Sequence, residues 1–210
     1  MAETGIHVQA IEWLHQALQD FFQDRPDVYI AADQFWYWEE GNNAARVAPD
    51  VMVVPGVGNR LRRSFFAWQE SGTPSVVFEI ASEGTWRDDL NDKYDLYERL
   101  GVREYFLFDP EAIHLVPPVQ GYRLHGTAYR RMREGLIESE LGFKLDAEGM
   151  MLRLTDSRTG TPMLTRAEQV QREKVRVDQA QAALDAEKAR ADALAAEVER
   201  LKKLLGEQAP

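Results

Sequence analysis

Apolar residues recur every three or four positions between residues 6 and 22, and polar residues separate them. This spacing predicts an amphipathic helix, and Thr4 is placed to cap its first turn. Two runs rich in aromatic and β-branched residues, 28–32 and 34–38, come next and predict strands. The chain is therefore expected to start with a helix followed by a pair of strands.

Three later runs, 51–54, 76–80 and 104–110, consist largely of apolar residues without regular polar alternation. This composition is expected of strands that are buried on both faces. Between the last two runs, a helix is predicted from Thr85 to Leu100, with Gly101 as its stop signal.

The rest of the body contains shorter predicted elements. They are a short helix at 64–70 and alternating strands at 113–116, 121–124, 129–133 and 151–154. The order of helices and strands along the chain predicts an α/β fold, with a mixed sheet and helices on both of its faces.

The pattern changes in the last part of the chain, so we divide it into a domain at 1–164 and a tail at 165–210. The tail carries an apolar residue at every seventh position: Val170, Val177, Leu184, Ala191, Val198 and Leu205. Glu173 and Glu187 interrupt the companion positions, which leaves a thin heptad seam. A continuous helix of this length would extend about 60 Å, so it should project from the domain or pair as a coiled coil.

Charge narrows the classes of function. The 210 residues carry a net charge of −10, and residues 165–210 hold nine basic and nine acidic residues. All the excess negative charge therefore lies in the body, which counts against a high-affinity, nonspecific nucleic-acid binder. The chain has no cysteine, which excludes disulfides and zinc-thiolate sites. We see no signal peptide or membrane span and expect a cytoplasmic protein.

Two acids and a lysine are the candidate catalytic residues. Asp50 precedes one apolar run, Glu79 interrupts a second, and Lys93 lies on the helix that follows. Carboxylate oxygens are the ligands that Mg²⁺ or Mn²⁺ prefers, and an ammonium stabilises charge on a transferring phosphate. In the alternative interpretation, Asp50 is only an acid in a turn and Lys93 is only a solvated lysine. An acid such as Glu79, however, has little structural reason to stand in a buried strand.

Other polar residues receive weaker assignments. Arg60, Arg62 and Arg63 are identified as the only basic cluster of the body, either as a solvated loop or as a contact to a phosphate backbone. Acids at 88, 89, 92 and 95 are assigned to helix capping and surface charge. His7 is assigned to helix packing, and the aromatic run 36–38 to core and edge packing.

Four motifs together resemble a known family. They are Pro49-Asp50, Val76 to Ser82, Lys93 to Tyr97, and Gly101 to Pro110. In this order and spacing they resemble the Uma2-like (DUF820) proteins, a chiefly bacterial family of the PD-(D/E)XK restriction-endonuclease-like superfamily. The resemblance covers roughly residues 6 to 155.

The resemblance implies a three-layer α/β/α core with a mixed sheet. It also implies Mg²⁺ held by Asp50, Glu79 and the backbone carbonyl of Ile80. The usual strand lysine of the superfamily would stand where this chain has Ala81. The family's alternative takes the lysine from the following helix, and Lys93 matches that position.

We therefore hypothesise a Mg²⁺-dependent endonuclease that hydrolyses DNA, with RNA left open as a substrate. A homodimer, formed through the tail, is the simplest assembly. The alternative is a catalytically silent nuclease-fold module that binds nucleic acid or assembles with partners through its tail.

Overall fold

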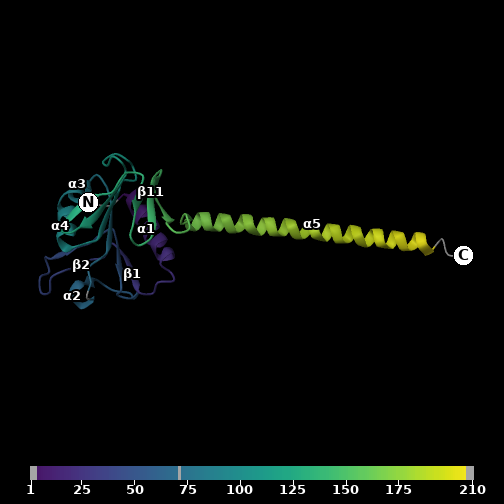
Figure 1. Ribbon diagram of the computed structural model, residues 1–210, viewed down its shortest axis with the longest axis horizontal. Helices are drawn as coiled ribbons and strands as arrows, with labels where there is room; N and C mark the ends of the chain where they lie inside the picture. The colour runs from purple at the N-terminus through teal and green to yellow at the C-terminus, as the bar shows by residue number, and fades with distance from the viewer. Residues whose placement is uncertain (1–3, 71, 207–210) are drawn as a thin grey trace. The chain divides into compact units, whose positions relative to one another are not determined.

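In a computed structural model, residues 4–70 and 72–206 are described, and the chain divides between Met163 and Leu164 into two compact units (Figure 1). Helix α1, Gly5–Phe21, opens the first unit. The hydroxyl oxygen of Thr4 accepts a 3.3 Å hydrogen bond from the backbone N–H of His7, so the predicted cap is confirmed.

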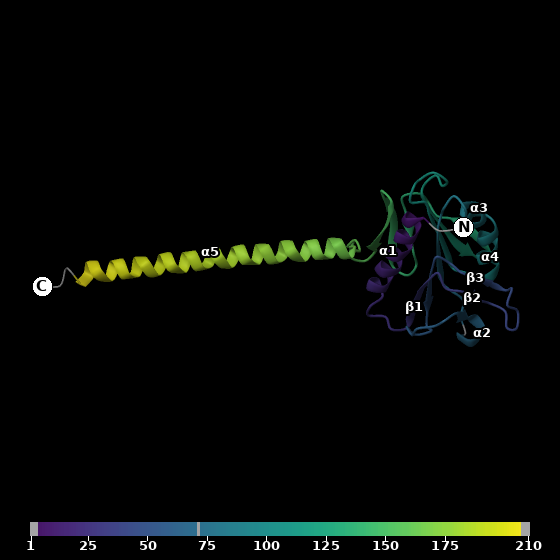
Figure 2. The same cartoon turned by 180° about the vertical axis from the view of Figure 1, so that it is seen from behind.

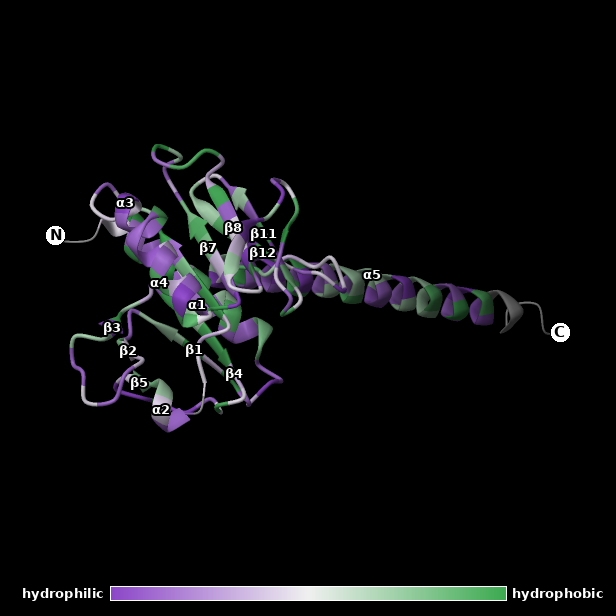
Figure 3. Cartoon of the chain, turned by 60° about the vertical axis from the view of Figure 1, so that its left-hand side comes forward, coloured by the Kyte–Doolittle hydropathy of each residue, from purple (hydrophilic) through white to green (hydrophobic). Residues whose placement is uncertain are grey.

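A six-stranded sheet forms the centre of the first unit, in the order β1-β4-β6-β7-β8-β9. Its strands are β1 Val28–Ala32, β4 Val51–Pro55, β6 Val76–Ile80, β7 Glu104–Phe108, β8 Val119–His125 and β9 Ala128–Arg131. Strands β6 and β7 run parallel and the other neighbours run antiparallel, so the sheet is mixed, as predicted. Figure 3 shows hydrophobic residues gathered in β4 and β7.

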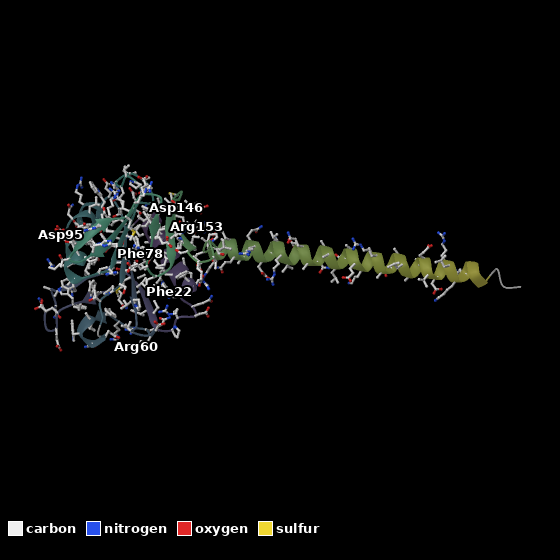
Figure 4. All side chains as sticks on the ribbon, in the orientation of Figure 1. Phe22, Arg60, Phe78, Asp95, Asp146 and Arg153 are labelled. Atoms are coloured by element: carbon white, nitrogen blue, oxygen red, sulfur yellow. The ribbon has the colours of Figure 1, made fainter. Side chains whose placement is uncertain are left out.

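One face of this sheet packs against α1 and a second sheet. That sheet consists of β10 Ile137–Glu138, β11 Phe143–Glu148 and β12 Met151–Asp156. Phe78 of the central sheet packs against Phe143 of β11, with 6.1 Å between ring centroids. The indole N–H of Trp13 donates a 2.7 Å hydrogen bond to the carbonyl of Leu152, which joins α1 to β12. Figure 2 shows α1 beside β1, and Figure 4 places Phe78 inside the body.

The opposite face carries helices and a third sheet. The helices are α2 Ala67–Glu70, α3 Trp86–Leu90 and α4 Asp92–Leu100, and the sheet has the order β3-β2-β5. Its strands are β2 Trp36–Tyr37, β3 Arg46–Val47 and β5 Phe65–Phe66. Buried Trp36 stacks on Tyr97 of α4 with 6.3 Å between centroids. The predicted layering, helices on both faces of a mixed sheet, is therefore confirmed.

Several details differ from the sequence prediction. The helix predicted from Thr85 to Leu100 is interrupted at Asn91 and forms α3 and α4. The strand predicted at 113–116 is a loop, because its N–H groups at His114 and Leu115 bond to the Asp109 carboxylate instead of to a neighbouring strand. The strands β3, β5, β10 and β11 were not predicted.

The second unit is a single helix, α5, Arg166–Gly206. Its side chains are described from residue 166 to residue 203, so Leu205 of the predicted heptad stripe lies outside them. Of the stripe, Val170, Val177 and Leu184 are 71%, 56% and 47% exposed. In the part of the chain that the structure covers, no helix is long and apolar enough to cross a membrane.

Candidate active site

The two predicted acids meet at one end of the central sheet. Asp50 stands immediately before β4, and Glu79 is the penultimate residue of β6. Because these strands are antiparallel neighbours, with Val51 opposite Phe78, the start of β4 lies beside the end of β6. The N–H of Ile80 donates a 2.6 Å hydrogen bond to Oδ2 of Asp50. The Asp50 carboxylate is thereby held next to the residue that follows Glu79.

Glu79 is fully buried and is held through both oxygens. The Tyr97 hydroxyl donates a 2.6 Å hydrogen bond to Oε1, and the Lys93 ammonium lies 2.8 Å from Oε2. Both partners come from α4, which packs over this face of the sheet. Helix α4 thus brings a lysine to the carboxylate, while Ala81, two residues beyond Glu79 on the strand side, carries no charge.

Asp89 is a third acid of the site, and its assignment to surface charge was wrong. It is 1% exposed, and its Oδ1 lies 2.9 Å from the Lys93 ammonium. The Tyr105 hydroxyl donates a 2.8 Å hydrogen bond to the Asp89 backbone carbonyl, which ties α3 to the sheet. The four-residue separation of Asp89 and Lys93 was the available sequence signal, since residues at this spacing face each other on a helix.

His7 is a further residue that the sequence did not bring to the site. It is 4% exposed on the first turn of α1, and its Nε2 lies 3.5 Å from Oδ1 of Asp50. The spacing of histidines gives no sign of this contact, because it joins residues 43 positions apart by tertiary packing.

Burial and mutual interactions shift the pKa values of the acids and the lysine of the site. Burial, opposed by Lys93 and reinforced by Asp50 and Asp89, raises the pKa of Glu79 to about 8. Burial also raises the pKa of Asp89, against the effect of Lys93. For Lys93, burial lowers the pKa, but the charges of Glu79 and Asp89 outweigh it and the net shift is upward. Lys93 therefore keeps its proton, and without a metal Glu79 is largely protonated at neutral pH.

This donor set fits a magnesium ion that retains several waters. Two carboxylates and a backbone carbonyl at 50, 79 and 80 are hard oxygen donors, and each carboxylate oxygen still has a lone pair beyond the bond it accepts. Across residues 4–70 and 72–206, no three His, Cys, Asp or Glu side chains form a closed metal site. Mg²⁺ does not require one, because it is commonly held by one or two carboxylates.

The predicted basic cluster is largely engaged within the fold. The Arg62 side chain is 3% exposed, lies 4.2 Å over the Tyr29 ring and pairs with Glu70 at 3.0 Å. Arg60 pairs with the same carboxylate at 2.6 Å, and Arg63 is exposed. The prediction that this is the only basic cluster of the body was wrong. Arg130, Arg131 and Arg133 form a second, and all three are exposed.

Comparisons with known proteins address the family. The Uma2 model, described as "putative restriction endonuclease", matches residues 1–147. The chain belongs to the Uma2 family.

A solved structure from Anabaena variabilis, described as a "putative nuclease belonging to DUF820", has the same fold, with a TM-score of 0.51 and 14% identity. The alignment covers 67% of this chain and 75% of that one. No curated protein matches the sequence. Family and fold confirm the predicted Uma2 resemblance and support a nuclease function in general for this Uma2 protein.

Proposed function

We propose that this Uma2 protein is an endonuclease that depends on Mg²⁺ or Mn²⁺ and hydrolyses phosphodiester bonds of DNA. One observation carries the proposal: the Lys93 ammonium lies 2.8 Å from the buried Glu79 carboxylate, beside the start of strand β4, which Asp50 precedes. An acid pair next to a fixed ammonium is the arrangement that metal-assisted phosphate hydrolysis needs. A DNA substrate also fits the expected cytoplasmic location.

Asp50, Glu79 and the Ile80 carbonyl would hold the metal ion. When bound, the ion polarises the phosphodiester and lowers the pKa of a coordinated water. It would also favour the deprotonated carboxylate of Glu79 over the protonated one. The N–H of Ile80 and the hydroxyl of Tyr97 fix the orientation of the two carboxylates, because each donates one hydrogen bond to them.

Lys93 acts as an electrostatic group in this proposal. Its raised pKa keeps it protonated at neutral pH, which excludes it as a general base. Its ammonium stabilises negative charge that develops on the phosphate oxygens. Asp89 is a positioning residue, since its carboxylate 2.9 Å from the ammonium holds Lys93 in place without being assigned to the metal.

The test combines metal binding with cleavage. Asp50→Asn and Glu79→Gln remove one carboxylate charge each at nearly constant volume. Each should weaken Mg²⁺ binding in calorimetry and reduce cleavage of plasmid DNA by a factor on the order of 100 to 1,000. Asp95→Asn is the matched control: Asp95 is an exposed acid on α4, at the periphery of the body in Figure 4.

The control variant should bind Mg²⁺ and cleave like the wild type. An RNA of the same sequence, assayed in parallel, decides between the two nucleic acids. Mg²⁺ binding that is unchanged in both Asp50→Asn and Glu79→Gln would remove the metal from this site and contradict the proposal.

A further inference from the structure

Arginines gather at the free edge of the central sheet. A cleft of about 490 Å³ is lined by Arg123 of β8, by Arg130 and Arg131 of β9, and by Arg133 just beyond β9. Glu138 and Glu140 complete its charged lining. We call the four arginines the basic edge. The lining holds four guanidinium groups against two carboxylates, in a protein whose net charge is −10.

Most of the charge of the basic edge is not used by the fold. Arg123 is the exception, because it pairs with buried Glu104 at 2.7 Å. Arg131 reaches only a neutral partner, the carbonyl of Val116 at 3.5 Å. Arg130 and Arg133 are exposed and make no ion pair with any side chain in the described ranges. Arg60 and Arg62 differ, since both pair with Glu70.

The basic edge wraps around strand β9. Arg130 stands opposite Arg123 in the register, and Arg131 stands opposite Tyr122. Successive side chains of a strand point to opposite faces, so Arg130 and Arg131 place charge on the two sides of the sheet. Beyond β9 no further strand pairs in this sheet among the described residues. An extended polyanion lying along this edge would therefore meet guanidinium groups on both sides.

We propose that the basic edge binds the phosphodiester backbone of the DNA substrate; this rests on the proposed nuclease function. The excess negative charge of the chain lies in this body and repels a polyanion, so attraction has to come from a local basic surface. Strand β9 lies three strands from β6, roughly 14 Å at ordinary strand spacing. That span corresponds to about four base-pair steps of duplex. Guanidinium groups are well matched to phosphate oxygens.

Binding of a fluorescent DNA duplex to the full chain, measured by anisotropy in EDTA at several salt concentrations, tests the proposal without cleavage. The Arg130→Ala/Arg133→Ala variant should bind about tenfold more weakly at low salt. Its slope of log K against log[salt] should be shallower by about 1.8. Both side chains are exposed, so the double variant should keep the melting temperature of the wild type.

Arg172→Ala/Arg200→Ala is the matched control. It removes the same charge from exposed positions of α5 that lie off the heptad stripe, and it should bind like the wild type. Equal weakening in both double variants would reduce the effect to net charge and overturn the proposal. Unchanged binding in Arg130→Ala/Arg133→Ala, or a wild type that does not bind DNA, would overturn it as well.

A separate cleavage assay in Mg²⁺ keeps the two proposals distinguishable. A wild type that binds through the basic edge but does not cleave would contradict the nuclease function and leave the basic edge as a DNA site. Cleavage with the same kcat/KM in wild type and Arg130→Ala/Arg133→Ala would support the nuclease and contradict the basic edge. If Arg130→Ala/Arg133→Ala lost binding to phosphatidylserine vesicles but bound DNA like the wild type, the basic edge would be assigned to a membrane surface and the proposal would be overturned.

Discussion

The hydroxyl of Tyr97 donates a 2.6 Å hydrogen bond to Oε1 of Glu79, and both side chains are fully buried. The Tyr97 ring is held in turn by stacking on Trp36, at 6.3 Å and 10° between planes. Tyr105 packs against it from β7 at 5.2 Å. The orientation of the Glu79 carboxylate is therefore fixed by aromatic packing from three different elements, β2, α4 and β7.

Tyr97→Phe should keep this packing and remove only the hydroxyl. The lost donor leaves Oε1 of a buried carboxylate without this bond, so unfolding free energy should fall by about 1–3 kcal/mol in urea titrations. Mg²⁺ affinity should fall too, because the carboxylate orientation is less restricted. Tyr94→Phe is the control on the same helix, since its hydroxyl makes no hydrogen bond within the described chain. Equal stability changes in the two variants would show that the hydroxyl bond to Glu79 contributes nothing specific.

Lys93→Ala should abolish most cleavage and also destabilise the fold. It leaves Glu79 and Asp89 buried without their cation, and breaking such a pair costs about 3–5 kcal/mol. Protonation of the acids relieves this cost, so the loss of stability should be larger at pH 8 than at pH 5. Melting temperatures at both pH values measure it. Wild-type turnover in Lys93→Ala would remove Lys93 from the mechanism.

Ala81→Lys in the Lys93→Ala background tests whether an ammonium from the strand that carries Glu79 can replace the one from helix α4. Ala81 is 6% exposed at the end of the strand that carries Glu79, so a lysine there returns an ammonium to the same carboxylate. Part of the cleavage activity and of the stability at pH 8 should return. Ala81→Met is the control of similar length without charge, and recovery in both double variants would show that filling space, not charge, is responsible.

The positions of Asp50 and Glu79 in the site could be predicted because each leaves a local trace in the sequence, whereas Lys93 was assigned from the family resemblance. Glu79 breaks an apolar run, Asp50 precedes another, and the order of strands brings the two run ends together. The contacts of His7 and Tyr97 leave no such trace, because they depend on how α1 and α4 pack on the sheet. Strand β11 was missed although its residues 143–146 alternate in burial, which is the period of a half-buried strand.

The metal-free protein should become less stable as the pH rises from about 4.5 to 8. The pKa of Glu79 is raised from 4.5 to about 8, chiefly by burial, so the folded state holds a proton that the unfolded chain has released. Unfolding free energy then falls by up to about 1.4 kcal/mol per pH unit across this window. Urea titrations at each pH, in EDTA, measure the slope. Mg²⁺ should flatten it, because the metal binds the deprotonated carboxylate.

Glu79→Gln is the control for this pH dependence. The amide keeps the size of the side chain and does not titrate, so the slope between pH 4.5 and 8 should become shallower. A slope that is the same in Glu79→Gln and in the wild type would place the titrating group elsewhere in the protein.

The full chain should be a dimer held through α5. In the single chain the heptad stripe is exposed, with Val170 at 71% and Val177 at 56%. Pairing two helices removes this apolar surface from water, at about 25 cal/mol per Å². Sedimentation at concentrations on the order of 10 µM should give a dimer for the full chain and a monomer for a chain ending at Met163. A dimer would also carry two active sites, as cleavage of both strands of a duplex requires.

Leu184→Glu and Ala186→Glu test whether the heptad stripe itself is the interface. Leu184 lies on the stripe, whereas Ala186 lies two residues further on, at a position that faces away from the seam. Both variants add one negative charge to an exposed helical residue, so they differ only in where the charge stands. Leu184→Glu should shift the dimer toward monomer, and Ala186→Glu should sediment like the wild type. If the wild-type full chain remains monomeric at the same concentration, the stripe is not a self-association surface and would bind a different partner. If both variants dissociate equally, the effect comes from charge repulsion along the whole helix.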